Sequence, residues 1–454
     1  MKATVVVDVA SLAHAIGSVQ HDRRTNASKR SRFVEPHLGT LAAVLENRGF
    51  EVQQFHVAVP VELVDTSGDV RAHSPTAWAV DRACQWIDEQ LVALRKIDIP
   101  LVVLPGGHDG VTEIGVDVAA ACGALFAASQ IRINSNDTDA VIVITHDSDL
   151  HVLGRAAHPA RVIFAGCFDR DARRRLQHEQ LPFVDLTDDE LRLLSQRWDP
   201  TLLTLRLSTL GHIGSGDPPS IEGETTDWEV VEQPKDSCLV IADPYGLACS
   251  ARYILGRSDL PTIESICAAL AHFGVRSDSP ILVTVPDVDF AGSRTDASEE
   301  SRHRHAAWRQ HDDELDQLAR TIDGDGDDDT RVCRARLPLH RLPNERFAVQ
   351  QELSPRVIKK LATQMVCDIY RCLLASSSQN IVVLTDSVDV TWALHLIPTF
   401  DLDESRVLRI GTAEAPIRRL SGGHPRLLDV RTGVLDAAHL AALTRVTEFS
   451  ESEL

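Results

Sequence analysis

Three aspartates of the N-terminal region stand where carboxylates can act together. The segment TVVVD ends at Asp8, and the segment DAVIVITHDSD contains Asp147 and ends at Asp149. In both segments an apolar, β-branched run typical of a buried parallel strand leads into the carboxylates. Carboxylates this close repel one another unless a cation neutralises them, and hard oxygen ligands suit Mg²⁺ or Mn²⁺. The same residues also serve as helix caps and turn formers, so an acidic strand end alone leaves both interpretations open.

A fourth aspartate, Asp117, follows the segment EIGV and opens the Ala-rich stretch VAAACGALFAASQ, which is typical of a helix. A carboxylate in a first helical turn also suits the positive end of the helix dipole. Because ligands of open α/β sheets bind outside the carboxyl ends of the strands, we expect these elements to meet at one edge. The predicted metal-ligating and catalytic set is Asp8, Asp117, Asp147 and Asp149, with Glu113 as an auxiliary residue. Carboxylates in this order are typical of a metal-dependent phosphodiesterase.

The three segments TVVVDVAS, EIGVDVAAA and VIVITHDSDL resemble the signature segments of the NYN branch of PIN-like nucleases. Members usually show D-x-x-N, K-G-V-D-V and S-G-D-S-D in this order. The resemblance covers about residues 1–195 and departs from the pattern at several positions. Ser11 stands for the usual Asn, Ile114 for Lys, Thr145 and His146 for Ser-Gly, and Gly123 for a second helix Asp.

The resemblance implies an α/β, Rossmann-like, three-layer fold with a mainly parallel sheet, and a metal-dependent endoribonuclease acting on single-stranded RNA. Mg²⁺ or Mn²⁺ on the four aspartates would lower the pKa of a bound water and stabilise charge on the phosphate. Three alternatives stay open. They are a tandem PIN-like module that binds RNA or protein without catalysis, a PIN-like nuclease acting on DNA, and, more weakly, a phosphatase with Asp8 as nucleophile.

A second set of landmarks repeats the first in the same order. SCLVIAD ends at Asp243 as TVVVD ends at Asp8, and IVVLTDSVD aligns with VIVITHDSD. The strand-like VAVP is matched by VTVP, and the helix-like LAAVLENRGFEV by ICAALAHFGV. Each of these two helices closes on a glycine suited to a helix C-cap, Gly49 and Gly274. These matches in register predict an internal duplication.

The second copy is chemically poorer than the first. The alignment puts Asp386 opposite His146 and Ser387 opposite Asp147, and Ala362 opposite Asp117. Two interpretations stay open. The copy is a degenerate PIN-like domain kept for packing and RNA contact, or it holds a rearranged site of Asp243, Asp368, Asp386 and Asp389.

The net charge of −20 opposes non-specific binding to nucleic acid, because Lys and Arg that neutralise phosphates supply most of that affinity. Two tracts are nevertheless rich in Lys and Arg, HDRRTNASKRSRF and DRDARRRL. Each can also be a solvated loop or helix face. Beside the acidic motif we expect RNA contacts from Ser11, Arg23, Arg24, Lys29, Arg30 and Arg32. For Arg170, Arg173, Arg174 and Arg175 we expect a solvated helix face, with phosphate contact as the alternative.

A chain of 454 residues has room for two to three domains. We expect a first PIN-like domain over 1–197, a Gly/Pro/Ser/Glu-rich linker over 198–234 and a second, degenerate PIN-like domain over 235–454. The acidic run DGDGDDD, from Asp323 to Asp329, lacks the final Glu of a Ca²⁺ loop and is interpreted as a solvated loop.

Nine cysteines are scattered without a CxxC pair, which favours a reducing cytoplasm over a disulfide framework. No stretch approaches the roughly 18–20 apolar residues that a spanning helix needs. We therefore expect a soluble cytoplasmic protein with RNA as its partner. The sequence leaves the oligomeric state open.

Overall fold

The structure is a computed structural model. It describes residues 1–20, 34–65, 85–103, 111–113, 115–133, 139–158, 160–195, 238–255, 261, 263–276, 279–289, 332–340, 348–349, 352–353, 355–375, 379–412, 431–435 and 437–443. Three predictions lie outside these residues: the basic tract with Arg23, Arg24, Lys29, Arg30 and Arg32, the linker over 198–234, and the acidic run from Asp323 to Asp329.

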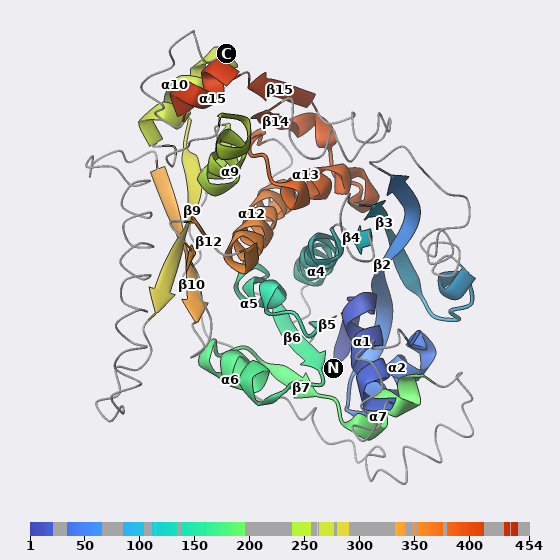
Figure 1. Ribbon diagram of the computed structural model, residues 1–454. Helices are drawn as coiled ribbons and strands as arrows, with labels where there is room; N and C mark the ends of the chain where they lie inside the picture. The colour runs from blue at the N-terminus through green and yellow to red at the C-terminus, as the bar shows by residue number, and fades with distance from the viewer. Residues whose placement is uncertain are drawn as a thin grey trace, which may run out of the picture. The chain divides into compact units, whose positions relative to one another are not determined.

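The chain divides into two compact units, unit 1 over Met1–Glu229 and unit 2 over Val230–Leu454. Figure 1 draws unit 1 from blue to green and the elements of unit 2 from yellow-green to red. The elements of unit 1 are β1 (Lys2–Val7), α1 (Val9–Gln20), α2 (Leu38–Asn47), β2 (Glu51–Asp65), β3 (Leu94–Val103), β4 (Val111–Glu113), α4 (Val116–Ile133), β5 (Ala140–Ile144), η1 (Ser148–Val152), α5 (Leu153–Ala156), β6 (Arg161–Gly166), α6 (Arg170–His178), β7 (Phe183–Asp185) and α7 (Asp188–Leu194).

The sheet of unit 1 has the order β4-β3-β2-β1-β5-β6-β7. Its strands pair in parallel except at β3 and β4, which run antiparallel. Taken in chain order, the parallel strands lie 3-2-1-4-5-6, the order of Rossmann folds. The order reverses between β1 and β5, so the topological switch point lies at the carboxyl ends of these two strands.

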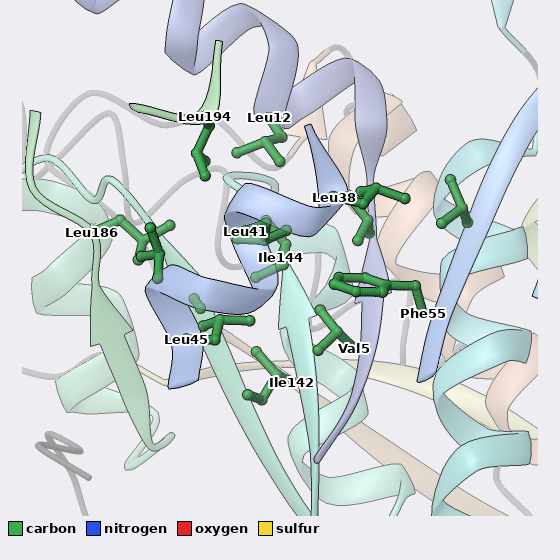
Figure 2. Close-up of a cluster of buried hydrophobic side chains, with 14 of the residues drawn as sticks. Val5, Leu12, Leu38, Leu41, Leu45, Phe55, Ile142, Ile144, Leu186 and Leu194 are labelled. Atoms are coloured by element: carbon green, nitrogen blue, oxygen red, sulfur yellow. The ribbon is translucent and has the colours of Figure 1, made fainter. Parts of the chain in front are cut away.

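Alternate residues of the central strands build a core beneath α1, α2 and α7. Val5 of β1 and Ile142 of β5 point into it, and Leu41 and Leu45 of α2 close it, all of them fully buried (Figure 2). Burying a side chain of this size contributes about 1.5–3 kcal/mol, so this face accounts for much of the stability of unit 1. The residues between them along each strand point to the opposite face of the sheet. There, His56 of β2 hydrogen-bonds the Gly123 carbonyl of α4. Helices therefore cover both faces of the sheet.

Unit 2 repeats this plan. Its elements are β8 (Leu239–Ala242), α9 (Pro244–Leu255), α10 (Ile263–His272), β9 (Ile281–Asp289), β10 (Val332–His340), β11 (Ala348–Val349), β12 (Glu352–Leu353), α12 (Pro355–Ala375), β13 (Ile381–Leu384), α13 (Val388–His395), η2 (Ile397–Phe400), η3 (Glu404–Arg406), β14 (Val407–Thr412), β15 (Arg431–Leu435) and α15 (Ala437–Leu443). The main sheet has the order β10-β9-β8-β13-β14-β15 and is parallel throughout, and β11 and β12 form a separate antiparallel pair. Its strands again lie 3-2-1-4-5-6 in chain order.

The predicted fold class is confirmed at the level of an α/β protein with two mainly parallel, Rossmann-like sheets. The predicted C-cap glycines are also confirmed, because Gly49 and Gly274 adopt φ values of 88° and 72° after α2 and α10. Among the described helices, none combines the length and the apolar character that crossing a membrane would require.

Candidate functional site at the carboxyl edge of unit 1

Asp8 directly follows β1 at the switch point and joins it to the end of β5. Its Oδ1 accepts a hydrogen bond from the Ser11 backbone N–H in the first turn of α1, at 3.0 Å, as a helix-capping carboxylate does. Its Oδ2 accepts a hydrogen bond from the Thr145 hydroxyl at 3.2 Å. The Thr145 Oγ1 in turn accepts the Asp147 N–H at 3.0 Å. Both oxygens of the predicted ligand Asp8 thus contribute to local structure.

His146 links three elements of the same edge. Its backbone N–H donates to the Ser11 Oγ at 2.8 Å, and its Nδ1 lies 3.1 Å from the same oxygen. Its Nε2 accepts the Cys167 N–H, after β6, at 2.9 Å. Gly166 permits this approach, because a Cβ there would meet the Thr145 carbonyl oxygen at 2.9 Å and the His146 Nε2 at 3.3 Å. Desolvation lowers the pKa of His146 to about 4, although nearby Asp169 opposes this shift, so the ring is neutral at pH 7.

Asp147 and Asp149 occupy different positions in the 3-10 helix η1 that follows β5. Asp147 is the N-cap of η1, and its Oδ1 accepts the Asp149 N–H at 3.0 Å. Asp149 lies inside this 3-10 helix and is buried. The capping interpretation of these aspartates, which the sequence left open beside the metal interpretation, describes Asp8 and Asp147.

Asp117 lies in the first turn of α4, as predicted, and is largely buried. In the part of the chain that the structure describes, no group of three or more His, Cys, Asp or Glu side chains is arranged to hold a metal ion. The described residues therefore do not display a fit for Mg²⁺ or Mn²⁺. Binding of these ions by Asp8, Asp117, Asp147 and Asp149 stays a prediction from the resemblance.

Unit 2 carries the same strand-end bonds. Asp243, after β8, accepts the Gly246 N–H at 2.8 Å and the Thr385 hydroxyl at 2.9 Å. The Thr385 Oγ1 accepts the Ser387 N–H at 2.9 Å. These three bonds match those of Asp8 and Thr145 position by position. We call this shared arrangement the Asp–Thr junction.

The residue after the junction threonine differs between the units. In unit 2 it is Asp386, which accepts the Thr412 N–H at 2.7 Å, the Thr412 hydroxyl at 2.9 Å and the Arg409 guanidinium at 3.3 Å. Arg409 also donates to the Thr391 hydroxyl and the Thr385 carbonyl. The Asp386 side chain is fully buried and the Arg409 side chain is 7% exposed. The Asp386 carboxylate is therefore neutralised by Arg409 of the same unit. The rearranged site predicted for Asp243, Asp368, Asp386 and Asp389 shows no metal cluster among the described residues.

Beyond Cys167, helix α6 brings arginines to the carboxyl side of unit 1. Its N-cap is Asp169, three residues after the end of β6. Arg170, Arg173 and Arg174 are exposed and spaced i, i+3, i+4, so they share one face. Arg173 pairs with Asp185 and remains 49% exposed, and Arg174 lies 3.8 Å from Asp171. Within the described residues Arg170 forms no ion pair. We call these three residues the arginine face.

A nucleotide phosphate is a poor fit at the switch point itself. Rossmann proteins hold pyrophosphate on a glycine-rich turn at the N-terminus of the first helix. Here the turn reads VDVAS, and the Asp8 carboxylate occupies the cap of α1. The matching place in unit 2 is held by Asp243. A phosphate there would meet a negative charge at close range.

Sequence reasoning found the strand-end aspartates and the arginine helix but missed Thr145, Cys167 and Arg409. The threonine left a signal, because it is shared by the aligned strings THDSD and TDSVD. In each unit the threonine hydroxyl bridges two strand ends, which explains why both units have a threonine at this position. Nothing in the sequence marked Cys167, since its backbone N–H is the group that matters.

No family model matches the chain, and no curated protein matches it. Some solved structures do. One is named as a UDP-N-acetylglucosamine 2-epimerase of Listeria monocytogenes, at 11% identity over 98% of this chain and 90% of the other, with a TM-score of 0.19. A second is the glycotransferase of kitacinnamycin, at 12% identity over 98% and 93%, with a TM-score of 0.16. A third, described as trehalose-6-phosphate from E. coli bound with UDP-2-fluoro glucose, has 11% identity over 100% and 92% and a TM-score of 0.16.

These findings overturn the prediction of a metal-dependent endoribonuclease. None of the three structures named above is described as a nuclease, and the described residues hold no group of three or more His, Cys, Asp or Glu side chains that could bind a metal ion. The physical reason is visible at the edge of unit 1, where the carboxylates of Asp8 and Asp147 are used as caps and strand ties. At TM-scores of 0.19 and below, the likeness itself carries no assignment of a sugar-nucleotide activity to this chain.

Proposed function

We propose that this protein is a tandem pair of PIN-like units, derived by internal duplication, that binds single-stranded RNA through unit 1 without cutting it. The observation that carries the proposal is the arginine face, Arg170, Arg173 and Arg174, on the helix that follows β6. The resemblance of the strand-end segments to the NYN branch supplies the choice of RNA.

The scaffold part of the proposal is supported by repeated details. Both sheets have the strand order 3-2-1-4-5-6, and both switch points carry an Asp–Thr junction with three matching hydrogen bonds. A shared strand order is common to many Rossmann-like folds, but a shared threonine tie between the first and fourth strands is a side-chain detail. Such a detail favours descent of the two units from one copy.

The binding part is supported by charge and accessibility. The net charge of −20 opposes binding of polyanions in general, so among the described residues a local cluster of exposed arginines is the feature suited to attach one. Arg170 forms no ion pair within the described residues, and surface pairs such as Arg174 with Asp171 contribute little and exchange readily for a phosphate. An arginine fork matches two phosphate oxygens at once.

Fluorescence anisotropy with a labelled single-stranded RNA tests the proposal. The double substitution Arg170→Gln with Arg174→Gln removes two phosphate contacts, so it should weaken binding and reduce the salt slope of log K by about 1.4, at roughly 0.7 per contact on a single strand. Arg192→Gln, in the last turn of α7 and 50% exposed, is the matched control and should change neither quantity.

An unchanged affinity and slope in the arginine double variant would place the RNA elsewhere and contradict the proposal. The same mixtures, incubated with Mn²⁺ and resolved on a sequencing gel, should show intact RNA. Cutting that disappears in Asp147→Asn would contradict binding without cleavage.

A further inference from the structure

The hydrogen bonds around His146 determine which ring nitrogen carries the proton. The Cys167 N–H donates to Nε2 at 2.9 Å, so Nε2 has to be an acceptor. A neutral imidazole with an acceptor at Nε2 carries its proton on Nδ1. The Nδ1–H therefore donates to the Ser11 Oγ, 3.1 Å away. The other tautomer would set Nε2–H against the Cys167 N–H, and a doubly protonated ring would do the same.

This tautomer determines what the Ser11 hydroxyl can do. Its oxygen already accepts two hydrogen bonds, one from the His146 backbone N–H at 2.8 Å and one from Nδ1–H. A serine hydroxyl has two acceptor positions and one proton. With both acceptor positions taken, the proton of Ser11 has to point away from His146. Ser11 is partly exposed, so this donor is open to a ligand at the carboxyl edge.

The surrounding charge selects the acceptor. Asp8 and Asp147 lie beside Ser11 and His146, and their carboxylates disfavour a phosphate at this point. An uncharged hydroxyl is a better partner, because it accepts from Ser11 and can donate to a neighbouring carboxylate. The 2′-hydroxyl of ribose has this double character and separates RNA from DNA.

We propose that Ser11 contacts a ribose 2′-hydroxyl and that His146 is the positioning residue that turns its proton toward the ligand. This inference rests on the proposed RNA binding. The bond between His146 and Cys167 ties the site to the loop that leads into α6, so ribose recognition and the arginine face lie on one connected segment. Unit 2 carries Gly246 and Asp386 at the two matching positions and lacks this donor.

Histidine NMR on the full chain tests the tautomer independently of any ligand. In protein labelled with ¹⁵N-histidine, a long-range ¹H–¹⁵N correlation should show a protonated Nδ1 and an unprotonated Nε2 for the signal that disappears in His146→Asn. A signal with the proton on Nε2 would overturn the positioning role.

Affinity for RNA, DNA and 2′-O-methyl RNA of one sequence tests the contact. Wild-type protein should prefer RNA, and Ser11→Ala should lower only RNA binding, about three- to tenfold, the effect of one hydrogen bond. Ser18→Ala is the control, because the Ser18 hydroxyl on the same helix donates to the Ala15 carbonyl at 2.7 Å. His146→Asn retains an N–H at the position of Nδ1 and should keep the preference for RNA, whereas His146→Leu should lose it.

The outcomes separate the two proposals. Equal affinity of the wild type for RNA and DNA, with both weakened by the arginine double variant, would overturn ribose recognition and leave the arginine face standing. A preference for RNA that survives in Ser11→Ala would overturn the role of Ser11 alone. No binding of RNA by the wild type would overturn both.

Discussion

The carboxyl edges of units 1 and 2 share a backbone and a junction but hold opposite kinds of chemistry. At the position after the junction threonine, unit 1 carries His146, whose partners are a serine hydroxyl and backbone groups. Unit 2 carries Asp386, which is buried against Arg409 and both polar groups of Thr412. One edge keeps an accessible donor, and the other satisfies its charges internally. The comparison indicates that the junction is structural in both units and that function belongs to what surrounds it.

The largest effect we expect comes from the buried pair of unit 2. Arg409→Met leaves Asp386 charged and without its counter-ion, and breaking a buried pair typically costs about 3–5 kcal/mol. Pulsed hydrogen-exchange mass spectrometry along a urea series can follow this loss in peptides from β13 and β14. Arg174→Met, whose partner lies 3.8 Å away at the surface, should cost under about 1 kcal/mol. Equal small losses in both variants would mean that solvent reaches the Asp386 pair.

A second feature of unit 2 is a buried carboxyl group on its long helix α12. In unit 2, burial raises the pKa of Asp368 to about 7 against the lowering effects of Arg371 and Gln364, and its Oδ2 has no hydrogen-bond partner among the described residues. The unfolded chain loses this proton near pH 4 and the folded chain near pH 7. Stability of unit 2 therefore falls as the pH rises through this window.

Asp368→Asn removes that penalty and should stabilise unit 2 by about 4 kcal/mol at pH 8, at roughly 1.4 kcal/mol per unit of pKa difference. The gain should vanish near pH 3, where Asp368 is protonated in both the folded and the unfolded chain. Urea midpoints at the two pH values, read by pulsed hydrogen exchange in α12, measure it. A stabilisation that is the same at both pH values would assign the effect to packing instead of charge.

Unit 1 should respond to pH in the opposite direction. Desolvation lowers the pKa of His56 to about 4, aided by Arg95 and opposed by the hydrogen bond to Gly123. Between pH 6.5 and 4 the unfolded chain binds a proton that the folded chain refuses, so stability falls as the pH drops, by at most about 3 kcal/mol. His56→Leu, which copies Leu282 of unit 2, should flatten this acid slope in peptides from β2. An unchanged slope would assign the acid loss to other groups.

The strands and their polarity followed from the sequence because buried parallel strands are uninterrupted β-branched runs, and the second parallel sheet followed because those runs recur in order. The role of the aspartates did not follow. A capping carboxylate and a metal ligand look alike in sequence, and the choice depends on partners such as Thr145, which lies 137 residues from Asp8. The buried Arg409 was missed for a similar reason, since its compensating Asp386 lies on another strand end.

The smallest expected effect tests the shared junction directly. Thr145→Val and Thr385→Val each remove a hydroxyl that donates to an aspartate and accepts a backbone N–H, at nearly constant shape. Each should cost about 1–2 kcal/mol, because a buried acceptor and a buried donor lose their partner together. The two losses should agree within about 0.5 kcal/mol when each is read by pulsed hydrogen exchange in its own unit. A cost confined to Thr145 would show that unit 2 no longer depends on its junction, and the equivalence of the two edges would then hold for the backbone alone.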